Sequence, residues 1–293
     1  NKSQFASTQE HRQRIVNLIK DYRTLLGQGV VARFDPETYS DAVAFARIGE
    51  GSLGGKARGL AFMNSMILKH RLYDKHANVR IMIPRSVVIA TDYFDDFIRL
   101  NGLKYIISQE FSDEEILSEF VSSTVPARLQ QELKAYIQTV RTPLAVRSSS
   151  KLEDSHYQPF AGIYSTYMIP YVDNGDQMLR LLLKAVKSVY ASVYFATSRA
   201  YLSSSQNLIS EEKMAVIIQE VCGTEQDGLF FPTFSGVARS INYYPIGDEA
   251  PADGVCNIAM GLGKLVVDGG RTLRFSPRYP QKVLQTSTPE LAL

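Results

Sequence analysis

The sequence changes character near residue 205, and this change limits the folds that the chain can adopt. Before it, amphipathic helical patterns alternate with short apolar runs such as Val79–Ala90 and Pro143–Ser150. After it, runs rich in β-branched and aromatic residues predict antiparallel strands, at 213–223, 228–245 and 254–263. We therefore expect an α/β (α+β) protein in which a mixed first part precedes a strand-rich second part.

Several segments repeat apolar residues at three- and four-residue spacing, which predicts helices. The first is Ser7–Gly27, and the next is about Ala57–Leu72, after a glycine-rich stretch. Val79–Ala90 is expected to form a pair of short buried strands interrupted by Pro84. Further helices are expected near residues 93–100, 113–121, 126–140 and, as the longest, about 175–202.

Composition excludes several classes of protein. The 293 residues suffice for about two domains or lobes, and the net charge of +2 gives no electrostatic case for nucleic-acid binding. No apolar run approaches the roughly 20 residues of a membrane span, and the first residues lack the apolar core of a secretory signal. Cys222 and Cys256 lie in apolar runs, so we expect buried thiols and a cytoplasmic protein.

The stretch Arg47–Met63, RIGEGSLGGKARGLAFM, places Lys56 in a glycine-rich segment that precedes a helix. A Walker A loop would need glycine at the position of Glu50 and a hydroxyl at the position of Ala57, and both requirements fail. A lysine at a helix N-terminus is still suited to anions. Taken alone, the stretch is better explained as an ordinary glycine-rich turn with an exposed lysine.

Three further segments carry residues suited to a nucleotide. Arg147 ends an apolar strand and precedes three serines, so a guanidinium lies beside hydroxyl donors. Gln219 carries the amide within the apolar run MAVIIQEVCG. One interpretation is that this amide contacts a purine, and the other is that the run is a plain core strand. In IAMGLGKLVVDGG, glycine turns flank Lys264 and Asp268. A salt bridge for Arg147 and a solvated strand edge for the last segment remain open.

Taken in order, these stretches resemble the nucleotide-binding domain of the pyruvate phosphate dikinase and phosphoenolpyruvate synthase family. Relatives of that family include rifampin phosphotransferases and glucan, water dikinases. The resemblance spans roughly Gly54–Gly270 and rests on GGKARGLAFM, IPRSVVIATDYF, LAVRSSSKLEDSHYQPFAGIYST, AVIIQEV, SGVARSIN and GLGKLVVDGG. It implies a two-lobed ATP-grasp fold that holds ATP. We expect a helical extension at 1–45, a first lobe at 46–205 and a second, strand-rich lobe at 206–293.

The resemblance also implies roles for individual residues, by position. Lys56, Arg147 and Arg278 would hold the phosphates and form the catalytic set. The other residues that it places around the cofactor ATP are Gly162, Thr166, Gln219, Glu220, Val221, Asn242 and Lys264.

In the family's reaction, the terminal phosphates of ATP pass to a histidine on a separate swivelling domain. A barrel domain then uses that phosphohistidine on pyruvate. The four histidines of this chain, His11, His70, His76 and His156, lack the glycine- and threonine-rich context of the family's phosphohistidine. We therefore expect the ATP-binding and phosphotransfer part of a phosphoenolpyruvate synthase-like dikinase, a fragment of a longer multidomain chain that does not complete the reaction alone.

Magnesium is the expected companion of ATP, but one position departs from the family pattern. The family's turn usually reads G-L-G-E, with a glutamate that helps to hold the metal, and here Lys264 stands in its place. Asp268 or Glu220 is a candidate for a substituting acid, or Lys264 contacts phosphate directly. Alternatively, the domain is a regulatory module that binds nucleotide without turnover. A phosphotransferase with an antibiotic or glucan acceptor is a further alternative.

Overall fold

The computed structural model describes residues 12, 31–37, 39, 43–150, 164–204, 212–267 and 269–286. The chain divides into two compact units, Asn1–Val221 and Cys222–Leu293. The helix expected over Ser7–Gly27 lies outside the described residues except for Arg12. The described end of the expected extension at 1–45 is not helical, because Ala32–Arg33 forms a strand.

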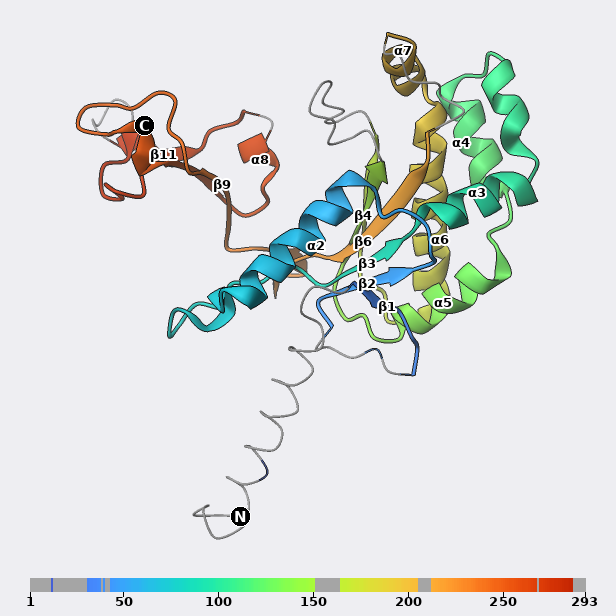
Figure 1. The fold of residues 1–293 in the computed structure, drawn as a ribbon, viewed down its shortest axis with the longest axis horizontal. Coiled ribbons are helices and arrows are strands. Elements are labelled where there is room, and N and C mark those ends of the chain that lie inside the picture. The colour runs from blue at the N-terminus through green and yellow to red at the C-terminus, as the bar shows by residue number, and fades with distance from the viewer. Residues whose placement is uncertain are drawn as a thin grey trace. The chain divides into compact units, whose positions relative to one another are not determined.

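A six-stranded mixed sheet forms the centre of the first unit (Figure 1). Its spatial order is β1-β2-β3-β6-β4-β5. The pairs β1–β2 and β2–β3 are parallel, whereas β6 is antiparallel to both β3 and β4, and β5 is antiparallel to β4. The bounds are Ala32–Arg33 for β1, Phe45–Ile48 for β2, Ser86–Ile89 for β3, Leu144–Ser150 for β4, Thr166–Ile169 for β5 and Met214–Glu220 for β6.

The helices of the first unit confirm most of the sequence expectations. Their bounds are Gly54–Lys69 for α2, Thr91–Leu100 for α3, Asp113–Ser122 for α4, Ala127–Ile137 for α5, Gly175–Ala191 for α6 and Ala196–Ser204 for α7. The α/β class predicted from the sequence is thereby confirmed. Figure 1 shows α2 on one side of the sheet and α3 to α6 on the other.

The helix expected over residues 175–202 is interrupted in the structure. It ends at Ala191, and a 3-10 turn over Ser192–Tyr194 separates α6 from α7. The Ser192 hydroxyl donates to the carbonyl of Val189 at 2.7 Å, and Ser198 Oγ donates to the carbonyl of Ser192 at 2.6 Å. Such bonds from a side chain to a nearby carbonyl compete with the regular helical ladder, which the apolar periodicity of the sequence does not reveal.

The strand faces separate two hydrophobic clusters. Because alternate strand residues point to opposite faces, Val216 and Ile218 of β6 enter the large cluster with α3 to α6. Ala215 and Ile217 enter a smaller cluster with Ala57 of α2. The sheet is therefore covered on both faces, and α2 covers the face that carries the smaller cluster.

Two expectations from the sequence differ from the structure. In Val79–Ala90 the second expected strand is β3, but Val79 makes only an isolated bridge to His76, and the residues before Pro84 are mostly exposed. The boundary between the two compact units falls after Val221 in the sequence rather than near residue 205, because β6 pairs on both sides inside the sheet of the first unit. The assignment of ATP-grasp lobes to these units stays a prediction.

The second unit consists of short antiparallel strands, as the sequence predicted. β7 and β8 form a hairpin, and its turn residues Asp227 and Gly228 have φ values of 51° and 77°, which fits a tight Asp-Gly hairpin turn. A three-stranded sheet has the order β11-β10-β9. The bounds are Thr224–Gln226 for β7, Leu229–Phe231 for β8, Phe234–Arg239 for β9, Val255–Met260 for β10, Lys264–Val267 for α8 and Leu273–Phe275 for β11.

A buried polar network lies within the second unit. Ala259 is the one buried apolar side chain among this unit's described residues. Arg274, by contrast, donates from Nη1 and Nη2 to the two carboxylate oxygens of Glu249 at 3.1 and 2.8 Å. Asn242 Nδ2 donates to Glu249 at 2.8 Å, and the Glu249 side chain is only 6% exposed. This ion pair therefore contributes to the stability of the second unit, in which few apolar side chains are buried.

The expectation of two buried thiols was wrong. Cys222 is exposed and Cys256 is half-buried. Cys222 lies beyond the last residue of β6, outside the buried strand, although the apolar run continues through Val221 in the sequence.

We predict that the Glu249–Arg274 pair stabilises the second unit in a pH-dependent way. The hydrogen bond from Arg274 lowers the pKa of Glu249 from the usual 4.5 to about 2. A carboxylate with a lowered pKa stabilises the fold above pH 4.5, and this contribution is lost as the pH falls toward 2. Glu249→Gln should lower the free energy of unfolding at pH 7 by about 3 kcal/mol, because it leaves a buried guanidinium without its charge partner.

The chain contains no tryptophan, so a Phe275→Trp background gives a fluorescent reporter within β11. Urea unfolding of this background, with and without Glu249→Gln, should show a difference in stability that shrinks from pH 5 to pH 2. A difference that stays constant over this range would contradict the assignment.

Candidate nucleotide site

The glycine-rich stretch connects β2 to α2 at the carboxyl end of a parallel strand. Gly49 directly follows β2 and has φ 92°, and α2 begins at Gly54, which has φ 73°. Both values lie in the left-handed region, which glycine occupies without the penalty of a Cβ atom. The turn thus reverses the chain within a few residues and places Lys56 in the first turn of α2.

The start of α2 is fixed to the end of β4 by Ser149. Its hydroxyl donates to the carbonyl of Leu53 at 2.8 Å and accepts the N–H of Ala57 at 3.0 Å. A Cβ atom at Gly54 would lie 1.8 Å from the carbonyl oxygen of Ser149, a distance that no packing adjustment can relieve. The glycine is therefore required by contact between two backbones.

Lys56 and Arg147, the two phosphate-binding residues expected in this unit, each donate to a polar side chain of the sheet. Lys56 Nζ donates to Ser148 Oγ at 3.3 Å, and both Lys56 and Arg147 are half-buried. Arg147 Nη1 donates to Gln219 Oε1 at 3.2 Å. The antiparallel register pairs Ala145 with Gln219, which brings the β4 and β6 side chains to the same place.

Gln219 is held at both ends of its amide. Its Nε2 donates to Ser86 Oγ at 3.1 Å, and Ser86 in turn donates to the carbonyl of Pro84 at 2.8 Å. This series of hydrogen bonds orients the amide oxygen of Gln219 toward Arg147. A guanidinium presents several donors in a planar fork, a geometry that suits phosphate oxygens.

Glu220, the next residue, is engaged elsewhere. It forms an ion pair with Arg85, and the two side chains are only 16% and 12% exposed. Arg85 also donates to the carbonyl of Thr139 at 3.1 Å and lies 5.8 Å from the ring centroid of Tyr39. Gln219 and Glu220 thus have separate sets of partners, as neighbouring strand residues on opposite faces do. A metal ion at Glu220 would have to compete with the guanidinium of Arg85.

Thr166 and Val221 are also expected at the site, and both belong to the first unit. Thr166 opens β5 opposite Arg147 in the register and is exposed. The backbone N–H of Val221 donates to the carbonyl of Pro143 at 2.9 Å, at the end of the same sheet. Gly162 lies outside the described residues, as does Asp268 of the second unit.

In the second unit, the expected site residues have different environments. Asn242 is buried in the network of Glu249 and Arg274, where its oxygen accepts from Arg274 Nη2 at 3.3 Å. Arg278 is exposed, and its backbone N–H donates to Ser276 Oγ. Lys264 opens α8 and is exposed. The amide of Asn242 therefore serves the interior of the unit.

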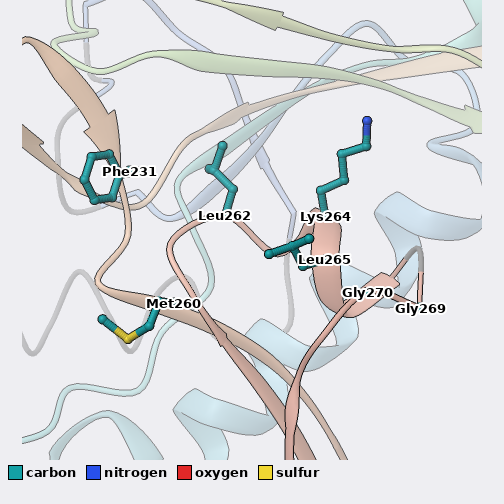
Figure 2. Close-up of a pocket in the computed structure, with 7 residues that line it drawn as sticks. All are labelled: Phe231, Met260, Leu262, Lys264, Leu265, Gly269 and Gly270. Carbon is teal, nitrogen blue, oxygen red and sulfur yellow. The ribbon is translucent and has the colours of Figure 1, made fainter. Parts of the chain in front are cut away.

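Lys264 borders a mostly apolar hollow of about 500 Å³ (Figure 2). The figure shows Phe231, Met260 and Leu262 around the hollow, while the Lys264 side chain extends away from Gly269 and Gly270. Leu265 completes the lining. All of these residues belong to the second unit, so the hollow is a feature of that unit alone.

Among the described residues, no group of three histidine, cysteine or acidic side chains is placed to hold a metal ion. The described helices are also too short or too polar to cross a membrane.

The comparisons with known proteins show the family. Residues 50–286 match the model of the pyruvate phosphate dikinase AMP/ATP-binding domain, and the chain belongs to this family. It is 27% identical over 234 residues to the uncharacterized phosphotransferase YvkC of Bacillus subtilis, which covers 79% of this chain and 24% of the relative. Over 238 residues it is 24% identical to phosphoenolpyruvate synthase of Aeropyrum pernix, covering 74% of this chain and 25% of that protein.

A probable phosphoenolpyruvate synthase of Staphylothermus marinus is 26% identical over 214 residues, which cover 64% of this chain and 23% of the relative. The chain thus spans about a quarter of the length of these curated relatives. The resemblance inferred from the sequence is confirmed, and the chain contains an ATP/AMP-binding domain of this family.

The sequence did not reveal which residues support the site. The three serines after Arg147 suggested hydroxyl donors for phosphate, but Ser148 bonds to Lys56 and Ser149 bonds to the start of α2. Asp92, which contacts the glycine-rich stretch, was also missed. It lies about forty residues from the loop in the sequence, and no local pattern signals that contact.

We predict that replacing two glycines of α2 by alanine has opposite effects on the free energy of unfolding. Gly54→Ala should lower the free energy of unfolding by about 3 kcal/mol, because the new methyl group overlaps the Ser149 carbonyl and the backbone is left-handed. Gly59 lies in the exposed interior of the same helix, and a Cβ there would meet nothing within 4 Å. Gly59→Ala should raise stability by about 0.5–1 kcal/mol.

Urea denaturation of both variants, followed by circular dichroism, measures the two effects. Equal stabilities for the two variants would show that the contact between Gly54 and Ser149 does not hold in solution.

Proposed function

We propose that this chain is the ATP-binding and phosphotransfer part of a phosphoenolpyruvate synthase-like dikinase with an ATP-grasp fold. The observation that carries the proposal is the pair of cations beside the start of α2. Lys56 is joined to Ser148, and the adjacent Arg147 is oriented by Gln219, within the residues that match the family. The similarity to a phosphotransferase and to phosphoenolpyruvate synthases supports a role in phosphate transfer.

The geometry fits the electrostatic demands of phosphoryl transfer. The transferred group spreads negative charge over its equatorial oxygens, so catalysis depends on positioned cations. Lys56 supplies a point charge, and Arg147 supplies a planar fork whose orientation is set by the amide of Gln219. Arg278, which is exposed in the second unit, is the third cation of the proposed set. Magnesium, when bound with ATP, would neutralise phosphate charge.

The acceptor in this proposal is a histidine on another domain of a longer chain, which also carries the pyruvate and phosphoenolpyruvate chemistry. We place the protein in the cytoplasm, where ATP is available. An antibiotic or a glucan in place of pyruvate would require the same nucleotide site, because the acceptor is bound elsewhere.

Lys264 supports a second candidate function, a regulatory module that binds nucleotide without turnover. It stands at the position of the glutamate that the family uses for magnesium, and it is exposed at the start of α8. Phosphohistidine formation by the longer polypeptide would reject this candidate and support the dikinase.

We predict that magnesium-ATP stabilises the chain through Arg147. A ligand present at 100 times its dissociation constant adds about 2.7 kcal/mol to the stability of the state that binds it. The melting temperature should therefore rise with magnesium-ATP, and Arg147→Ala should remove the rise because the phosphates lose their fork-shaped partner. Differential scanning fluorimetry over a range of ATP concentrations measures this effect.

Arg99→Ala is the matched control. This arginine lies on α3, is 78% exposed and pairs with Asp96, so its loss removes the same charge from a distant surface. The control should keep the full shift. If no nucleotide shifts the wild-type melting temperature, the proposed function fails.

We also predict that Lys264→Glu tightens the binding of magnesium-ATP about tenfold, because it removes a cation and restores a hard oxygen ligand. Isothermal titration calorimetry with and without EDTA measures the effect. The gain should vanish in EDTA, where the added carboxylate only repels the phosphates. An equal gain in EDTA would show that Lys264 does not stand at a metal position.

A further inference from the structure

Asp92 holds the glycine-rich loop from the first turn of α3. Its carboxylate oxygens accept the N–H groups of Glu50 and Gly51 at 2.9 and 3.0 Å. The adjacent Thr91 accepts the N–H of Ser52 through Oγ1 at 2.9 Å, and its own N–H donates to the Ser52 carbonyl at 3.0 Å. Three consecutive amides of the loop are thus bound by two neighbouring residues of one helix.

The two leading glycines of the loop are required by this contact. A Cβ at Gly49 would lie 2.5 Å from Asp92 Oδ1, and one at Gly51 would lie 2.6 Å from the Asp92 backbone nitrogen. Gly49 also has a φ of 92°. Gly59, eight residues beyond Gly51, has open space instead. Gly49 and Gly51 are therefore required by contacts inside the protein. The carboxylate of Asp92 binds the loop amides in the way that an anionic ligand binds the amides of a backbone nest.

We propose that Asp92 is a positioning residue that acts through Lys56, an inference that rests on the proposed function. The loop between β2 and α2 is held at two points. Asp92 and Thr91 fix residues 50–52, and Ser149 fixes Leu53 and Ala57. Lys56 lies between Leu53 and Ala57, the two residues that Ser149 fixes, and four residues after Ser52, so both contacts constrain the position of its Cα.

This arrangement assigns different tasks to the backbone and the side chains of the stretch. The amides of residues 50–52 bind Asp92 and Thr91, so phosphate oxygens are met by the side chains of Lys56 and Arg147. Asp92 lies in the first turn of α3, next to Thr91. A carboxylate accepts both amides, whereas a carboxamide accepts one and presents an N–H to the other.

Asp92→Asn tests the proposal with little change in volume. We expect the affinity for ATP to fall at least tenfold, while the affinity for adenosine, which lacks phosphates, changes less than twofold. Displacement of a fluorescent ATP analogue measures both. Hydrogen exchange at the amides of Glu50 and Gly51 should be slow in the wild-type protein and faster in the variant.

A double-mutant cycle with Lys56→Ala separates positioning from general destabilisation. If Asp92 acts through Lys56, Asp92→Asn should cause little further loss of ATP affinity once Lys56 is absent. Ser112→Ala is the matched control, because it removes an equivalent bond from a side chain to an amide at the start of α4. This control should leave ATP affinity unchanged. Thr91→Val, which loses one loop contact, should give a smaller effect of the same kind.

Three results would overturn the proposal. The first is an Asp92→Asn protein that binds ATP within twofold of wild type, and the second is fast exchange at Glu50 and Gly51 in the wild-type protein. An additive cycle with Lys56→Ala would also reject positioning through the lysine. If the wild-type protein binds no nucleotide, the proposed function fails, and the exchange data still report on the contact between Asp92 and the loop.

Discussion

The contact between the end of β4 and the start of α2 is the constraint on which the candidate site depends. Ser149 joins the two elements through its hydroxyl, and Gly54 permits the backbones to meet. Lys56 lies in the first turn of α2, beside this contact, and Arg147 lies two residues before Ser149 in β4. The contact therefore limits the distance between the two cations. The hydrogen bonds to Ser148 and Gln219 then orient their side chains. The glycine-rich stretch therefore fixes the start of α2 against the end of β4.

The sequence predicted the class of fold and most of its helices and strands, and the reason is physical. The phosphate-binding role of Lys56 and Arg147 stays a prediction. Periodic apolar patterns report which face of a helix or strand is buried, so α3 to α5 and β6 could be located. Contacts between distant segments leave no such periodic pattern. The contact of Asp92 with the loop, the ion pair of Arg85 with Glu220 and the break after Ala191 all depend on partners or local hydroxyl bonds that periodicity does not encode.

The two units differ in how they are stabilised. The sheet of the first unit has apolar clusters on both faces, whereas the second unit has an ion pair and an amide at its centre. Asn242, which the family resemblance places at the nucleotide, bonds within this network to Glu249 and Arg274. Glu220 pairs with Arg85 in the first unit. The roles of both residues at the nucleotide stay predictions.

Labelling with an acyl-phosphate derivative of ATP tests the central claim most directly, since this reagent transfers its acyl group to a lysine amine beside the bound phosphates. Peptide mass spectrometry should find the label on Lys56, and excess ATP should suppress it. Lys69 provides the internal comparison, because it is exposed at the other end of α2. Labelling that follows exposure, with Lys69 modified at least as much as Lys56 and no competition by ATP, would contradict the account.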